Sequence, residues 1–291
     1  MRVTNQMMIN TFRRNLSSSM REMDRLQEQL SSGRQINRPS DDPVGLTYAL
    51  RLRTNLTEND QYQRNVSDGL TWLENTDSAL NEAGQALQRA RELAVYGANG
   101  THSQESLDAI AREVAQIRQH LEAVANTEVA GRYLFAGTKT TTKPYDNGTW
   151  QGNTAVMKYE IGPGVTVPVN VSGAEVFGDN TDSVFKALSD LESKLLAGDT
   201  AGVSAQIGVI DQWLNKNQSI RAEVGARTNR FQLAQSRLED GYINFSTLLT
   251  KTEDIDTAKV ITELKMQEEV YRSALAAGAR IIQPTLVDFL R

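Results

Sequence analysis

The sequence predicts a mainly α protein, with long antiparallel helical rods, paired terminal coiled-coil helices and a small β-rich insert. Three observations lead to this prediction. Apolar residues recur with a helical period over most of the chain, and turn-forming glycines gather between about residues 131 and 177. The order of element types in the second half of the chain also mirrors the order in the first half.

The first helix is predicted from a heptad pattern near the N-terminus. Large apolar residues alternate three and four positions apart, which places them on one side of a helix and favours pairing with a second helix. The other side carries charged residues such as Arg13, Arg21 and Glu28. Ser31-Ser32-Gly33 ends the pattern. We name as the N-terminal seam the residues Ile9, Phe12, Leu16, Met23, Leu26 and Leu30.

A connector rich in turn-forming residues, from Asn37 to Asp41, separates this helix from the next one. Asp42 is predicted as the N-cap of the second helix, because its carboxylate can accept hydrogen bonds from free backbone N–H groups. Pro43 then occupies the first helical position, where its missing N–H costs nothing. The helical period continues from Val44 to about Ala94, which predicts a long rod.

The middle of the chain changes character after a third helix, expected from about residue 104 to 127. Turn sequences such as Asp146-Asn147-Gly148 and Gly162-Pro163-Gly164 follow at short intervals. Between them lie short β-prone runs at residues 155–161 and 165–171. We therefore predict a small unit of β-hairpins.

Helices return in the second half, at residues 183–196 and at about 201–252, and a last helix begins at about Asp256. This last helix repeats the three-and-four spacing of the first one. A pair of helices with so much apolar seam is only marginally stable alone, so we expect neighbouring copies to complete it. We name as the C-terminal seam the residues Ile261, Leu264, Tyr271, Leu275, Ile282, Leu286 and Phe289.

These elements predict three domains. The terminal coiled-coil domain comprises residues 1–40 and 255–291, and the helical rod domain comprises residues 41–136 and 180–254. The small β-rich domain comprises residues 137–179.

Composition argues against several classes of function. The chain has 31 Lys and Arg against 36 Asp and Glu, whereas nucleic acids and anionic membranes favour a net basic surface. It has no Cys and only two His, which leaves little material for a metal site or for nucleophilic catalysis. We predict no catalytic residue, no metal and no cofactor. The first six residues lack the apolar core of a secretory signal, so no cleaved signal is expected.

Alternative functions stay open at this point. Asp41-Asp42 could be a catalytic carboxylate pair, although capping before Pro43 accounts for both residues. The basic N-terminal segment could contact phosphates, but its arginines alternate with acids and can form salt bridges. The apolar stripe of the same helix could bind a membrane surface, although that helix has no Trp. We predict a structural protein that is not an enzyme, with no nucleic-acid and no membrane partner.

Four segments together carry a resemblance to a known family. They are the connector Leu30–Asn37 with Asp41–Leu46, the rod segment Arg221–Phe231, the segment Gly131–Lys139 and the terminus Asp288–Arg291. The chain resembles the bacterial flagellin family over roughly residues 1–137 and 183–291. Within that family, Gly131–Lys139 looks more like the hook–filament junction proteins than like flagellin itself.

The resemblance implies a flagellin-like fold and a structural role in the flagellum. Subunits of this kind leave the cell unfolded through the flagellar export apparatus, helped by a cytosolic chaperone, and assemble outside it with their terminal domain on the inner, channel side. A junction protein would form a homo-oligomeric ring, with a hook-associated protein on its hook side and flagellin on its filament side. The rival reading within the family is flagellin itself. The resemblance points to subunit contacts at Asn37, Asp41, Asp42, Arg221, Glu223, Asn229 and Arg230.

Overall fold

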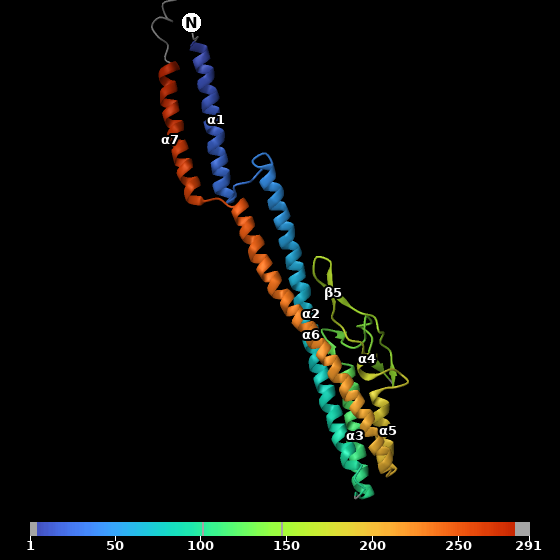
Figure 1. Ribbon diagram of the computed structural model, residues 1–291. Coiled ribbons are helices and arrows are strands. Elements are labelled where there is room, and N and C mark those ends of the chain that lie inside the picture. Colours follow the sequence, from blue (N-terminus) through green and yellow to red (C-terminus); the bar gives the residue numbers. More distant parts are fainter. Residues whose placement is uncertain (1–4, 101, 147, 283–291) are drawn as a thin grey trace, which may run out of the picture. The chain divides into compact units, whose positions relative to one another are not determined.

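The computed structural model describes residues 5–100, 102–146 and 148–282. The predicted mainly α fold is confirmed, and the predicted helix limits agree with the observed ones within a few residues. Its elements in chain order (Figure 1) are α1 (Asn5–Ser32), α2 (Pro43–Gly97), α3 (Gln104–Ala125), β1 (Glu128–Val129), β2 (Arg132–Tyr133), β3 (Tyr145–Asp146), β4 (Thr149–Trp150), β5 (Lys158–Gly162), β6 (Val165–Pro168), α4 (Gly173–Phe177), α5 (Val184–Leu196), α6 (Thr200–Glu253) and α7 (Thr257–Ile282).

The chain divides into two compact units. The terminal unit consists of Met1–Glu58 and Gly241–Arg291, and the central unit consists of Asn59–Asp240. The long helices α2 and α6 therefore each contribute residues to both units. The three-domain division described above groups the residues differently and stays a prediction.

In the terminal unit, α1 and α7 lie side by side and run antiparallel (Figure 1). The ring of Phe12 lies against Gly278, and the buried Ser19 Oγ accepts a hydrogen bond of 3.0 Å from the Gln267 amide. A Cβ atom at residue 278 would overlap the Phe12 ring. The absence of a side chain at Gly278 therefore allows the close approach of the two helices.

The central unit contains one continuous hydrophobic core, to which α2, α3, α5 and α6 all contribute. On α2 the core residues Val66, Leu73 and Leu80 recur every seven residues, so one side of the helix is buried along its length. Phe231 of α6 is also fully buried and packs against Gly69 of α2. The parts of α2 and α6 that belong to the central unit therefore bury apolar residues in this core.

The insert packs into the same core. Its strands form antiparallel two-stranded pairs, and in the β5–β6 pair Tyr159 lies opposite Val167. The Phe135 ring meets the Phe177 ring edge to face, with 5.2 Å between ring centroids. Ile161 and Val169 are buried in the core cluster that also contains the rod residues. The insert and the helices therefore share apolar contacts.

Local sequence signals explain the helix limits. Asp42 Oδ1 accepts hydrogen bonds from the N–H groups of Val44 (3.0 Å) and Gly45 (2.9 Å), which confirms the predicted N-cap. Ser183 caps α5 in the same way. The helix α4 was not predicted, because one short turn gives no measurable periodicity. It ends at Gly178, whose φ of 91° strongly favours glycine.

Candidate subunit interface

The N-terminal seam lies on α1 and is only partly covered. Leu26 is almost fully buried, with 2% of its surface exposed. The remaining seam side chains are half-buried; they are Ile9, Phe12, Leu16, Met23 and Leu30. The contact between the two helices therefore leaves part of the seam accessible.

The C-terminal seam is more exposed. Leu264 and Tyr271 are half-buried, whereas Ile261 and Leu275 are 44% and 43% exposed. The backbone of Ile282 belongs to α7, and its side chain is not among those described. Leu286 and Phe289 lie outside the described residues. The described part of this seam thus exposes large apolar side chains to solvent.

A second apolar stripe on α7 was missed in the sequence analysis. Met266 and Val270 are four residues apart, so they share a helix side, and they are 61% and 50% exposed. Met266 and Val270 lie outside the three-and-four pattern of the C-terminal seam, and their own four-residue spacing is the sequence signal that identifies them. Exposed apolar surface on α7 is therefore not confined to its seam.

Exposed apolar side chains gather in the terminal unit as a whole. Among the described residues, most of the large hydrophobic side chains that are exposed belong to this unit. Scattered exposed apolar residues are ordinary, but a concentration of them marks an interaction surface. They are Met7, Met8, Met20, Val44, Tyr48, Leu50, Tyr242, Ile243, Leu248, Ile261, Met266, Val270 and Leu275.

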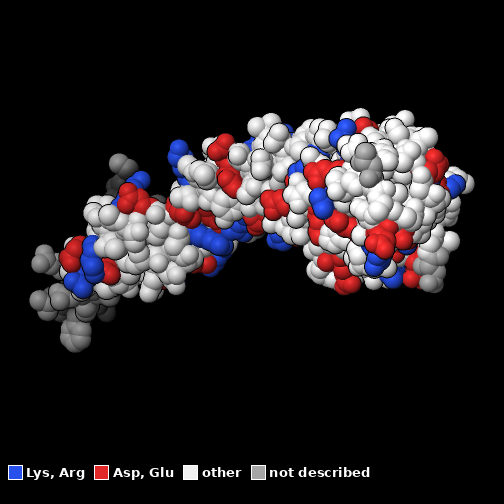
Figure 2. Space-filling view, turned by 90° about the horizontal axis from the view of Figure 1, so that it is seen from below, with Lys and Arg blue, Asp and Glu red and all other residues white. Residues whose placement is uncertain are grey.

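Three charged residues of α1, Glu22, Arg25 and Glu28, form ion pairs within the chain. Arg25 forms an ion pair with Glu22, and this hydrogen bond holds the pKa of the Glu22 carboxyl below its usual value. Arg38 of the connector pairs with Glu28 at 2.9 Å. Figure 2 shows positive and negative side chains interspersed over the face in view, separated by wide uncharged areas. This pattern suits a solvated protein surface better than a phosphate-binding one.

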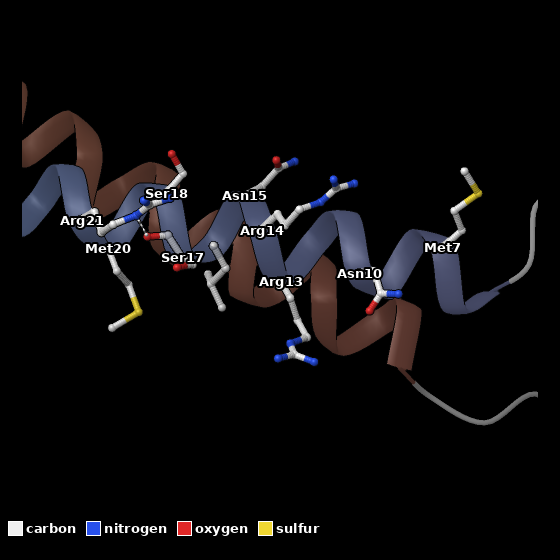
Figure 3. Close-up of a pocket in the computed structure, with 10 residues that line it drawn as sticks. Met7, Asn10, Arg13, Arg14, Asn15, Ser17, Ser18, Met20 and Arg21 are labelled. Atoms are coloured by element: carbon white, nitrogen blue, oxygen red, sulfur yellow. Dashed lines mark hydrogen bonds between the residues drawn. The ribbon is translucent and has the colours of Figure 1, made fainter.

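A shallow hollow beside α1 does not form a built site. Its lining runs from Met7 to Arg21 and comes from this helix alone. In Figure 3, Arg13 and Met20 point to one side of the helix while Arg14 and Asn15 point to the other. The side chains therefore diverge around α1 rather than converging on a ligand.

The connector residues that the family resemblance singled out shape the chain locally. Asp41 Oδ2 accepts hydrogen bonds from the N–H groups of Asn37 (3.2 Å) and Arg38 (2.8 Å). The Asn37 amide donates to the Arg34 carbonyl at 3.2 Å. Asp41 and Asp42 are nevertheless exposed. These residues therefore stabilise the connector within the chain, and their contact with a neighbouring subunit stays a prediction.

The rod segment of α6 is also engaged within the chain. The Arg221 guanidinium donates to Asp77 and to Asn81 of α2, each at 3.0 Å. Glu223 pairs with Arg227, which also donates to a backbone carbonyl of the insert. Asn229 and Arg230 are exposed. Arg221 therefore links α6 to α2, whereas Glu223 pairs within α6. A contact with a neighbour stays a prediction for all four residues.

Metal sites and membrane-spanning helices were also sought in the part of the chain that the structure describes. There, no three His, Cys, Asp or Glu residues are grouped in a way that could hold a metal ion. The described helices also include none with the length and apolar content needed to cross a membrane.

Comparison with known proteins decides the family. The bacterial flagellin N-terminal helical region matches residues 3–140, and the bacterial flagellin C-terminal helical region matches residues 207–290. Flagellin of Bacillus subtilis (strain 168) is 30% identical over 291 residues, an alignment that covers 94% of each chain. The chain belongs to the bacterial flagellin family.

A second relative of this flagellin-family protein and one solved structure are named as a flagellar hook-associated protein and a flagellar junction protein. Flagellar hook-associated protein 3 of Salmonella typhimurium is 26% identical over 300 residues, covering 94% of this chain and 95% of that protein. The crystal structure of the flagellar junction protein FlgL from Legionella pneumophila has the same fold, with a TM-score of 0.61 and 16% identity, covering 72% of this chain and 100% of that one. The flagellin-family protein described here is a structural component of the flagellum and not an enzyme.

Proposed function

We propose that this protein is the junction subunit that joins the flagellar hook to the flagellin filament. Copies assemble into a ring through the helices of the terminal unit, and the two seams are their contact surfaces. The observation that supports this proposal best is the partial exposure of both seams, together with the other exposed apolar side chains of the terminal unit.

Apolar burial supplies the driving force for this assembly. Each square ångström of apolar surface removed from water contributes about 25 cal/mol, so the half-exposed seam side chains gain stability when a sister copy covers them. Two isolated helices are marginal in water, whereas a ring repeats the same contact around a closed symmetric set. The terminal helices thus become fully stable only in the assembled structure, where they line the inner channel.

The two axial faces of such a ring meet different neighbours. A hook-associated protein binds on the hook side and flagellin binds on the filament side. The charged and polar residues of the connector and the rod segment position these neighbours; they are Asn37, Asp41, Asp42, Arg221, Glu223, Asn229 and Arg230.

The site of assembly is outside the cell. Copies pass unfolded through the flagellar export apparatus without a cleaved signal, and a cytosolic chaperone holds them beforehand. Weakly stable terminal helices suit this route, because a chain that must thread a channel benefits from segments that unfold at little cost.

Flagellin itself is the second candidate function, favoured by the 30% identity to the Bacillus subtilis protein. The junction role is supported by the hook-associated relative, which aligns over nearly its whole length, and by the Gly131–Lys139 segment. In that segment Leu134 and Phe135 are fully buried, so it shapes the core between insert and helices.

Immunogold labelling of isolated flagella tests the choice. We expect label in a short band at the boundary between hook and filament. Label along the whole filament, together with micrometre-long filaments grown from the purified protein, would establish the flagellin role instead. A strain that lacks the protein is expected to keep its hooks and to release flagellin into the medium.

A further inference from the structure

Glu253, the last residue of α6, is buried inside the terminal unit although it carries a charge. Only 6% of its surface is exposed. Its Oε1 atom accepts a hydrogen bond from Arg53 of α2 and lies 3.3 Å from Nε of Arg34, which follows α1. A buried carboxylate is costly unless it is paired, so these two guanidinium groups account for its presence here.

The backbone joins the same two chain segments. The Gln35 N–H donates to the Glu253 carbonyl at 2.6 Å, and the Ile255 N–H donates to the Gly33 carbonyl at 3.2 Å. Arg34 and Asp254 form an antiparallel bridge between these bonds. The connector after α1 and the connector before α7 are therefore tied together at one point.

Neighbouring residues fix this point from the α1 side. The buried Gln29 side chain donates to the Gln35 carbonyl at 2.9 Å. Gly33 turns the chain with a φ of 71°, a conformation that side chains disfavour. The bend that brings Arg34 to Glu253 is thus held by interactions on both sides of Arg34.

We propose that Glu253 is a positioning residue for assembly. We call Glu253, Arg34 and Arg53 together the clasp. The clasp keeps the two connectors in register, so that α1 and α7 reach the ring as an aligned pair with both seams oriented for sister copies. This inference rests on the proposed assembly through the terminal helices. The clasp residues lie outside the seams and act on assembly only through the alignment of α1 with α7.

Amide hydrogen exchange on the purified full-length protein tests the clasp without any assembly. In Glu253→Gln the side chain keeps its size but loses its charge. We expect exchange at the Gln35 and Ile255 amides to rise about five- to tenfold, as for the loss of one charge-assisted hydrogen bond. The matched control is Glu28→Gln, which removes the same charge from the exposed pair with Arg38 and is expected to leave both amides unchanged.

A second variant guards against misfolding of the first. Arg34 is half-exposed, so Arg34→Gln should fold normally, with an unchanged far-UV circular dichroism spectrum, and should raise exchange at the same two amides. Incorporation of each variant into flagella is then measured by labelling. We expect Glu253→Gln and Arg34→Gln to be incorporated several-fold less than Glu28→Gln.

The outcomes separate the clasp from the proposed function. Unchanged exchange at both amides in Glu253→Gln and Arg34→Gln would overturn the clasp, whatever happens to assembly. Faster exchange with normal incorporation would overturn its positioning role. The assembly proposal has its own separate test. If a variant with a disrupted seam, such as Leu26→Glu, were incorporated normally, that proposal would fail.

Discussion

At the scale of single residues, Leu26 offers the most direct test of the seam. It is the most deeply buried of the described seam side chains, with 2% of its surface exposed, and it lies on α1, which packs against α7. In Leu26→Glu the new carboxylate either leaves the buried position or stays there unpaired. Burying an unpaired carboxylate costs on the order of several kcal/mol. We expect the pair to separate and incorporation to be abolished, measured as loss of swimming motility.

The central unit provides the internal reference for this variant. Its core does not include Leu26, so most of the helical far-UV signal should persist. Gln27→Glu places the same charge on an exposed neighbouring position and should swim normally. Normal motility of Leu26→Glu would show that the seam is not an assembly surface.

Asp179 gives a pH-dependent prediction in the insert. Hydrogen bonds from the Thr181 hydroxyl and from the N–H groups of Asp182 and Thr181 lower its pKa from 3.8 to about 2. Because the pKa is depressed in the folded state, this carboxylate stabilises the fold fully above about pH 4, and its contribution disappears as the pH falls to about 2. Asp179→Asn should therefore be less stable than wild type at pH 6 and similar to it near pH 2.

Denaturant unfolding at both pH values measures this difference, and an NMR titration of the Asp179 carboxyl measures its pKa directly. A titration midpoint near 3.8, with equal stability of the two proteins at pH 6, would show that the hydrogen bonds from Thr181 and Asp182 do not stabilise the Asp179 carboxylate.

At the scale of elements, the contact between α2 and α6 depends on the absence of a side chain at Gly69. A Cβ atom there would overlap the buried Phe231 ring. We expect Gly69→Ala to destabilise the central unit by about 1–3 kcal/mol, because the ring must move within a close-packed core. Gly225→Ala on α6 is the matched control, since its Cβ meets nothing within 4 Å and alanine favours a helix.

Thermal unfolding should then move in opposite directions for the two glycine variants. The melting temperature is expected to fall for Gly69→Ala and to stay level or rise for Gly225→Ala. Equal melting temperatures for both would mean that α2 and α6 do not pack closely at Phe231.

Elements with local signals were predictable from the sequence. Asp42-Pro43 and Ser183 announce helix starts, and the heptad spacing reveals the two seams, because capping and periodicity depend only on nearby residues. Contacts between distant segments were not predictable. Nothing next to Arg221 indicates that its partner is Asp77, and nothing next to Glu253 indicates Arg34, since these pairs exist only after the chain has folded back on itself.

At the scale of the whole molecule, the two units differ in how completely they cover their apolar surface. The central unit encloses a continuous core, whereas the terminal unit exposes most of the large apolar side chains that are exposed among the described residues. The central unit thus buries its apolar residues within the chain, whereas the terminal unit leaves apolar side chains exposed to solvent. The proposed ring assigns those partners to copies of the same chain.

Oxidative footprinting can compare the free protein with isolated hook–filament particles. Met20 and Met266 of the terminal unit are exposed in the single chain and should become protected several-fold on assembly. Met157 of the central unit is half-buried and serves as the internal reference. Equal labelling of Met20 and Met266 in both samples would exclude the terminal unit as the assembly surface.

The division into two units also has an optical consequence. All three tryptophans of the chain, Trp72, Trp150 and Trp213, belong to the central unit. Indole fluorescence during heating therefore follows that unit alone, while α1 and α7 contribute no emission from this chromophore. Subtracting the fluorescence transition from the circular dichroism transition isolates the melting of the terminal helices. The unfolding of the two units can therefore be followed separately in the wild-type protein without an added label.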